Sequence, residues 1–220
     1  ETSRYYQART HIRHPKASLS DDKIQEGEID QDWLYWAGDA TVCDNKLQVL
    51  WNGVDNTNPD ALMRHEGICL AIYMKMLSAN HNFNPVDIYG FGSTLWEDED
   101  GHTYLYGSYN NYDVVVARST THDLDSPWEY YVCDASGQYI WQHSYPTQEE
   151  ISRSRIQETD CSMPWVFKKG DSYYMVAQSK WFGHEMYIFR SDKPYGPFIE
   201  RKSLFSIPNT LDKLGPQEYG

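Results

Sequence analysis

A strand-and-turn pattern recurs three times along this chain, and this recurrence limits the fold more than any other feature. A short apolar strand, a polar turn and a stronger apolar strand follow one another at residues 39–54, 92–108 and 162–179. A further apolar strand follows each pair, at residues 67–76, 112–119 and 185–192. The turns DNK, DEDGH and KKGDS carry the Asp, Asn and Gly residues that tight hairpins require. The pattern therefore predicts an all-β chain of antiparallel strands.

The second and third occurrences end alike, in a Pro beside an aromatic residue, at residues 126–130 (SPWEY) and 195–199 (YGPFI). Four strands in a unit of roughly 50–70 residues are typical of the blades of a β-propeller. The alternative is a β-sandwich made of the same strands, although a sandwich does not need such regular recurrence. We therefore predict a β-propeller that is five-bladed in full, with about three blades in this chain.

Three blades occupy residues 33–207 in this prediction, at about 33–90, 91–135 and 158–207, with an insertion at 136–157. Residues 147–156 (TQEEISRSRI) are the one stretch with a helical signal. Residues 1–32 are expected to be an irregular segment or the end of a preceding blade, and residues 208–220 an extension or linker. Because propellers usually need about 4–8 blades, we expect the circle to be completed by further blades or an adjoining domain of a longer chain.

Composition narrows the range of partners. The formal net charge of −13 and the pI near 4.9 disfavour a nucleic-acid partner, because an acidic surface repels phosphate backbones. No apolar run approaches the roughly 20 residues that span a bilayer. The four cysteines are widely spaced without a CxxC pair, which disfavours a zinc site. The aromatic share of 15% fits sheet packing and also sugar-stacking surfaces.

Chemistry in a propeller is expected where the first strand of each blade opens onto the central cavity. Asp39 opens the first such strand, where it would act as a general base, accept a sugar hydroxyl or simply cap a turn. Glycosidases need a second carboxylate about 5–9 Å away. Glu158 and Asp160, which lead into the third blade, are the candidates, and solvated loop acids are the alternative. The sequence has no GxSxG, P-loop, HExxH or GxGxxG motif.

Other polar and aromatic residues are candidates for contact with a ligand. Arg64 and His65 precede a strand of the first blade, in a predicted rim loop, and His184 follows a loop with aromatic residues. The candidate stacking surfaces for pyranose rings include Trp36, Tyr109, Trp165 and Trp181. No cofactor is expected. The acidic hairpin turn at residues 97–100 is read as solvated, with a structural or axial calcium ion as the alternative.

Several stretches resemble the blades of five-bladed glycosidases of the arabinanase and β-xylosidase type, glycoside hydrolase family 43. These are WEDEDGHTYLYGS, VVVARS, MPWVFKKGDSYYMVAQS and FRSDKPYGPF. The stretch DWLYWAGDATVCDNKLQVLWNGV, followed by YLYGSYNNYDVVVAR, is more similar to the domain-of-unknown-function families 5005 and 4185. The likeness covers about residues 33–207 and implies a propeller that acts on oligo- or polysaccharides in a secreted, periplasmic or cell-surface location.

In the arabinanase type, three acids open the first strands of successive blades: a base, a pKa-modulating Asp and a general-acid Glu. The resemblance implies that Asp39 falls on one of these positions, with Gly92 and Ser162 at or near the other two. Three hypotheses follow: a glycoside hydrolase-like propeller with Asp39 as an axial acid, a non-catalytic carbohydrate-binding propeller, and a rigid module for surface assembly. If the protein is an enzyme, the expected reaction is hydrolysis of O-glycosyl bonds.

Overall fold

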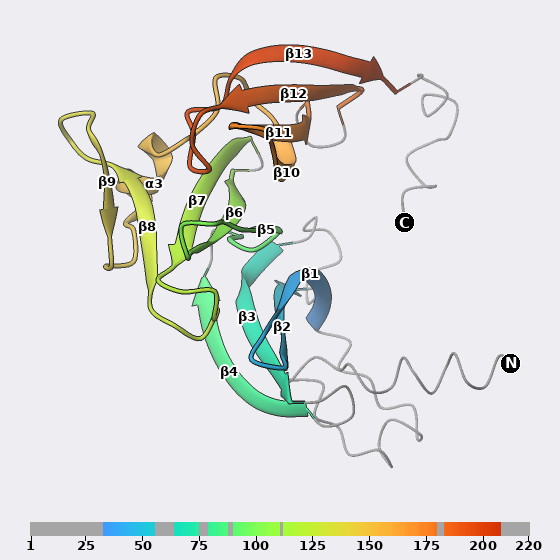
Figure 1. Cartoon of the computed structure of the whole chain (residues 1–220), viewed down its shortest axis with the longest axis vertical. Coiled ribbons are helices and arrows are strands. Elements are labelled where there is room, and N and C mark those ends of the chain that lie inside the picture. The colour runs from blue at the N-terminus through green and yellow to red at the C-terminus, as the bar shows by residue number, and fades with distance from the viewer. Residues whose placement is uncertain are drawn as a thin grey trace, which may run out of the picture. The chain divides into compact units, whose positions relative to one another are not determined.

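The computed structural model describes residues 33–55, 64–74, 79–87, 90–110, 112–179 and 183–207. Within this part, the strands before residue 37, from 51 to 55 and from 64 to 87 are described by their backbone alone. The described chain is built almost entirely of β-strands, with one short helix (Figure 1). No helix among the described residues has both the length and the apolar character needed to cross a membrane.

The strands form three sheets. The first sheet has the order β1 (Trp33–Cys43), β2 (Lys46–Asp55), β3 (Arg64–Met74) and β4 (Ala79–Asp87). The second has the order β5 (Thr94–Glu97), β6 (Thr103–Tyr109), β7 (Asp113–Ser119), β8 (Trp128–Cys133) and β9 (Tyr139–Gln142). The third has the order β10 (Ser162–Lys169), β11 (Ser172–Gln178), β12 (Glu185–Ser191) and β13 (Ile199–Ser206).

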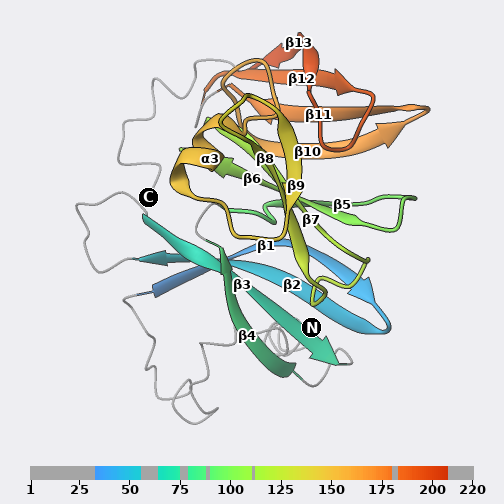
Figure 2. The ribbon, with the colours of Figure 1, turned by 90° about the vertical axis from the view of Figure 1, so that its left-hand side faces the viewer.

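Each sheet has the connectivity of a propeller blade, because strands consecutive in the chain are neighbours in the sheet. Neighbouring strands run antiparallel throughout the first and third sheets. Figure 2 shows the four strands of the third sheet side by side. The prediction of an all-β chain made of propeller blades is confirmed.

The chain divides into two compact units. Residues 1–105 and 118–128 make up the first unit, which contains the first sheet. Residues 106–117 and 129–220 make up the second unit, which contains the third sheet. The strands of the second sheet are shared between them. These units cut through the second sheet, whereas the predicted boundaries separate whole blades. The predicted blade boundaries therefore stay a prediction.

The first hairpin shows how the sequence sets a strand boundary. Asp44 and Asn45 both take positive φ angles, 49° and 60°, between the paired residues Cys43 and Lys46. A two-residue turn of this kind matches the right-handed twist of the strands it joins, and Asn and Asp tolerate it best. The predicted turn at DNK is therefore present.

The stretch from 136 to 157, predicted as an insertion, contains both a strand and a helix. Strand β9 pairs with β8 and gives the second sheet a fifth strand, which the sequence pattern did not indicate. The helix α3 (Gln148–Arg153) lies within the stretch that carried the helical signal. A capping box between Thr147 and Glu150 begins it, and the buried Ile151 anchors it.

Candidate functional site

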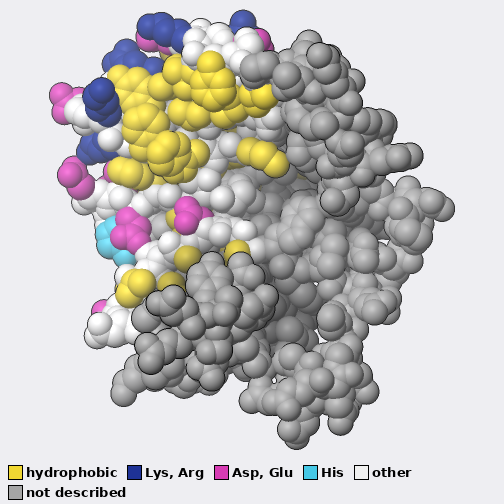
Figure 3. Space-filling model, turned by 90° about the vertical axis from the view of Figure 1, so that its right-hand side faces the viewer, with side chains coloured by type: hydrophobic (Ala, Val, Ile, Leu, Met, Phe, Trp, Pro, Cys, Tyr) yellow, Lys and Arg dark blue, Asp and Glu magenta, His cyan; other side chains and the backbone are white. Residues whose placement is uncertain are grey.

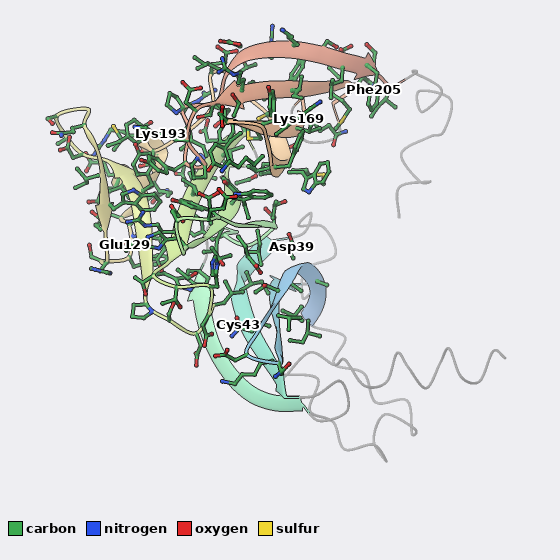
Figure 4. The ribbon with its side chains drawn as sticks, viewed as in Figure 1. Asp39, Cys43, Glu129, Lys169, Lys193 and Phe205 are labelled. Carbon is green, nitrogen blue, oxygen red and sulfur yellow. The ribbon has the colours of Figure 1, made fainter. Side chains whose placement is uncertain are left out.

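Asp39 lies in an irregularity of strand β1. The register between β1 and β2 shifts between Ala37 and Ala40, so Asp39 falls on a bulge, where a side chain can be turned away from the regular alternation. Its carboxylate accepts the backbone N–H of Ala40 at 2.8 Å and that of Leu95, in β5, at 2.9 Å. Its own N–H donates to the carbonyl of Gly92 at 3.0 Å. Asp39, labelled in Figure 4, is half-buried and holds β5 against β1 within the first unit.

Gly92 has a packing reason to lack a side chain. Its φ angle is +96°, in the region that favours glycine, and a Cβ atom there would lie 2.2 Å from Cδ1 of the fully buried Leu50. The position where the family resemblance places an Asp is therefore filled by backbone. Of these two predicted acid positions, only Asp39 carries a carboxylate, because position 92 is a glycine.

The acidic turn at residues 97–100 is largely satisfied by its own hairpin. Asp98 is buried and accepts the indole N–H of Trp96 at 3.0 Å. Asp100 accepts the N–H of His102 at 3.0 Å and the hydroxyl of Tyr104 at 2.6 Å. Glu97 accepts the hydroxyl of Thr41. Across the described ranges, no group of three or more His, Cys, Asp or Glu side chains is arranged to hold a metal ion.

The segment that leads into β10 is fixed by backbone hydrogen bonds within the second unit. The N–H of Ile156 donates to the carbonyl of Val114 at 2.9 Å, and the N–H of Cys161 to that of Tyr112 at 3.1 Å. Between them, the buried Gln157 side chain accepts the N–H of Val114 at 3.0 Å and donates to the carbonyl of Tyr112 at 2.8 Å. A buried amide that bonds on both sides fixes this segment in register with β7.

Arg155 is the electrostatic centre of this segment. Its Nη1 lies 3.3 Å from Oδ1 of Asp113 and 3.1 Å from Oδ1 of Asp160, and its Nε donates to the carbonyl of Gln157 at 3.0 Å. Burial raises the pKa of Asp113; Arg155 opposes this increase and the charge on Asp160 adds to it. Burial also raises the pKa of the Cys161 thiol to about 12. One guanidinium thus bridges two carboxylates.

An open hollow of about 520 Å³ lies beside this ion-pair cluster, wholly within the second unit. Its lining combines two carboxylates, a guanidinium, hydroxyl groups and a phenol ring: Arg155, Glu158, Thr159, Asp160, Ser179, Gly183 and Tyr187. Such a set offers donors and acceptors for the hydroxyl groups of a polar ligand, with an aromatic ring at one side.

The structure brings two of the three predicted acids together. Glu158 and Asp160 both line the hollow, and both are exposed. Each is already engaged, because Oε1 of Glu158 accepts the N–H of Arg201 at 2.7 Å while Asp160 pairs with Arg155. Asp39 belongs to the other unit, so the predicted catalytic role of the three acids stays a prediction.

The predicted binding residues whose side chains are described do not line this hollow. Trp165 is 60% exposed on the sheet, Tyr109 is half-buried at the end of β6, and His184 is exposed beside Gly183. Arg64 and His65 begin strand β3, so the predicted rim loop is wrong at these two positions. The strand starts earlier because they pair with Asp55 and Val54. Trp181 and the side chains of Trp36, Arg64 and His65 lie outside the described residues.

Sequence reasoning missed Arg155, Ser179 and Tyr187. Arg155 falls in the predicted insertion, and no local pattern shows that β7, about forty residues earlier, supplies its partner Asp113. Tyr187 was counted only as part of an apolar strand. The available signal was the spacing of Arg155 before Asp160, which puts opposite charges at the two ends of a short loop.

Three solved structures are similar to this chain. A candidate hydrolase from Bacteroides ovatus is 56% identical, with a TM-score of 0.80, over 93% of this chain and 53% of its own. A GH43_1 enzyme from Xanthomonas citri in complex with xylose is 19% identical, with a TM-score of 0.48, over 77% of this chain and 54% of its own. An α-L-arabinanase variant from Cellvibrio cellulosa is 14% identical, with a TM-score of 0.44, over 75% and 54%.

The chain spans about half the length of the Bacteroides ovatus protein. A comparison with curated proteins finds no match. The model of a protein family described as "domain of unknown function (DUF5005)" matches residues 1–219, almost the whole chain. This is one of the two uncharacterised families that the sequence resembles. The chain belongs to the DUF5005 family.

Proposed function

We propose that this protein is a glycoside hydrolase-like propeller that binds a glycan in the open hollow of its second unit. The observation that supports this most is the lining of the hollow, where the Arg155–Asp160 ion pair and the Tyr187 ring face one open space of about 520 Å³. Proteins commonly bind sugars by hydrogen bonds from charged groups to hydroxyls, together with contact between an aromatic face and the ring.

The relative from Bacteroides ovatus supports the hydrolase-like part of the proposal, since it is described as a candidate hydrolase and is 56% identical. The net charge of −13 fits a neutral glycan better than a polyanion. A secreted, periplasmic or cell-surface location is part of the same proposal, because polymeric glycans are met there.

Binding is better supported by the geometry than cleavage at this hollow. A general acid is usually held in a buried, apolar place that keeps its proton on. Glu158 and Asp160 are both exposed, and each is already engaged with a partner. Cleavage is the second candidate function, and Asp39 is the acid that we propose for it.

Titration calorimetry with a panel of neutral oligosaccharides tests the binding proposal. Replacing Asp160 by Asn should weaken binding about tenfold, because one hydrogen-bond acceptor and its ion pair are lost. The matched control is Asp192→Asn, since Asp192 also pairs with an arginine, Arg190, at 3.0 Å but lies outside the hollow. Equal affinities of Asp160→Asn and Asp192→Asn for the glycan would exclude the hollow as the binding site.

Turnover tests the second candidate separately. We expect the unaltered protein to hydrolyse a chromogenic glycoside and Asp39→Asn to abolish this turnover. The far-UV circular dichroism spectrum of the variant should stay unchanged. Full turnover by this variant would exclude Asp39 from the mechanism. Turnover that survives in Asp39→Asn but is lost in Asp160→Asn would move the chemistry to the hollow.

A further inference from the structure

Strand β13 carries a β-bulge at Glu200 and Arg201. These two residues lie opposite the single residue Phe189 of β12, between pairs in regular register. Glu200 has a φ angle of 57°, which a residue with a side chain seldom adopts. A bulge turns a side chain away from the regular alternation of its strand, and such bulges are common next to active sites. The bulge therefore gives Arg201 a direction that a regular strand would not give it.

Two residues that line the open hollow hold Arg201 in place. Its backbone N–H donates to Oε1 of Glu158 at 2.7 Å. Its guanidinium lies over the ring of Tyr187, with 4.9 Å between Cζ and the ring centroid. Both partners line the hollow, and all three residues belong to the second unit. The guanidinium of Arg201 is therefore placed beside the hollow in which we propose that a glycan binds.

Arg201 differs from the other arginines of the second unit in what its guanidinium contacts. In the part of the chain that the structure describes, this guanidinium lies over the Tyr187 ring but makes no hydrogen bond or ion pair. Arg153, Arg155 and Arg190 each pair with a carboxylate, at 2.7, 3.1 and 3.0 Å. Contact with a ring uses the charge of a guanidinium but none of its five N–H donors. Arg201 is thus held in place with its donors available to a ligand.

The charges around the hollow single out Arg201 as the position for an anionic group. Among the described residues that line the hollow, Arg155 is the one cation, and it is shared between the carboxylates of Asp113 and Asp160. Its charge is therefore already compensated, whereas that of Arg201 is not. Figure 3 shows lysine and arginine side chains concentrated at the level of the third sheet, although the whole chain has a net charge of −13.

We propose that Arg201 binds a carboxylate group of the glycan, so that the preferred ligand has a neutral main chain and one uronic acid residue. The guanidinium fork matches a carboxylate through two parallel N–H···O bonds, and a single sugar hydroxyl does not offer this pair of acceptor atoms. One acidic residue is repelled less than a polyanion, since charges more than about 8–10 Å away are largely screened. This inference rests on the proposed binding at the hollow, and it adds the class of sugar and a specificity-determining residue.

An alternative role for Arg201 is to hold the Tyr187 ring and nothing more. The contact between the guanidinium and the ring does not depend on the charge of the ligand. A role limited to the ring would therefore affect acidic and neutral glycans alike, whereas binding of a carboxylate affects the acidic glycan alone. Two ligands that differ only in the carboxylate separate the two roles.

The test is titration calorimetry with two oligosaccharides that differ in one group. The first carries a single uronic acid residue, and in the second this carboxylate is reduced to a primary alcohol. We expect the acidic ligand to bind about fivefold more tightly, which corresponds to an exposed ion pair of good geometry. The difference should shrink at about 1 M salt, where the screening length is about 3 Å.

Arg201→Gln should remove this difference by lowering the affinity for the acidic ligand alone. The backbone N–H at this exposed position still bonds to Glu158, so the circular dichroism spectrum should stay unchanged. Arg201→Lys keeps the charge without the fork and should retain only part of the difference. The matched control is Lys202→Gln, which removes the same charge at the next position, also exposed, and should leave the difference intact.

Equal affinities of the unaltered protein for the two ligands would overturn this inference but leave the proposed binding site standing. If neither ligand binds, the proposed function fails as well. The inference is also overturned if Arg201→Gln weakens binding of both ligands to the same extent, since Arg201 then only holds the ring. The same holds if Lys202→Gln removes the difference as fully as Arg201→Gln, since the overall charge of the strand is then the cause.

Discussion

The backbone of Gly92 lies against the side chain of Leu50, and a Cβ atom added at position 92 would stand 2.2 Å from Leu50 Cδ1. Leu50 is fully buried, so its side chain has little room to move away. The same glycine carbonyl accepts the N–H of Asp39 at 3.0 Å. The Gly92 backbone, packed closely on Leu50, therefore helps to position Asp39, the predicted axial acid.

Gly92→Ala should lower the free energy of unfolding, because the alanine is both strained and overpacked. The positive φ costs about 1–2 kcal/mol, and the clash with Leu50 adds about 1–3 kcal/mol. The matched control is Gly101→Ala, since Gly101 has a φ of +90° but nothing within 4 Å of an added Cβ. Urea unfolding should show the larger loss at 92, and equal losses at both positions would contradict the packing argument.

Asp39→Ala should destabilise the first unit, because the backbone N–H of Leu95 loses a charged acceptor 2.9 Å away. Hydrogen bonds to charged groups contribute about 1.5–3 kcal/mol, and the half-buried site places the expected loss toward the lower value. Asp39→Asn keeps one oxygen acceptor and should lose less. Chemical denaturation of the two variants checks this order, and a reversed order would exclude the bond to Leu95 as the cause.

The pKa of Asp123 is lowered in the folded protein. Partial burial opposes this direction, but the Gln48 amide, the Asp125 N–H and the charge of Lys46 outweigh it. Because the folded pKa lies below the unfolded one, the stabilisation is present above the unfolded pKa of about 3.9. It is lost as the pH falls through the folded value.

Gln48→Met should therefore flatten the acid side of the stability profile. Gln48 is fully buried, donates to Asp123 and accepts the N–H of Leu124 at 2.8 Å. The variant loses about 1–3 kcal/mol at every pH from the unpaired Leu124 N–H. Unfolding measured from pH 6 to pH 2.5 separates this constant loss from the pH-dependent part. If the unfolding free energies of the unaltered protein and of Gln48→Met fall in parallel with pH, the lowered pKa of Asp123 is contradicted.

The Cys161 thiol should resist modification in the folded protein. It is fully buried and its pKa is raised to about 12, so little thiolate exists at pH 8. Iodoacetamide labelling followed by peptide mapping should show Cys161 unlabelled at pH 8 and labelled in urea. The half-buried Cys43 serves as the internal comparison and should react first. Labelling of Cys161 at the rate of Cys43 would contradict its burial.

The blade pattern could be predicted from sequence because the signal is local. Turn residues such as Asp44 and Asn45 lie between apolar runs, and the structure has the hairpin at this place. Strand β9 could not be predicted in the same way, since its four residues gain their partner only by pairing with β8. Local periodicity does not report an added edge strand.

The site was harder to predict because its contacts join distant parts of the chain. Glu158 and Asp160 could be chosen as acids that precede a strand, and both line the hollow. Glu158, however, gains its partner Arg201 across 43 residues of sequence, which no local pattern reports. The bulge at Asp39 likewise arises from the register between β1 and β2, which the residue pattern does not specify.

The outer edge of the third sheet has a consequence for colloidal behaviour. Among the described strands, β13 lies at the edge of its sheet, and all eight of its residues are exposed. Unpaired edges invite strand-to-strand stacking into fibrils, and charged side chains on the edge are the usual protection. Glu200, Arg201 and Lys202 supply three consecutive charges between Ile199 and the apolar Leu204 and Phe205. This charged run lies between the apolar residues on either side of it. We expect it to oppose pairing of the edge strand with other chains.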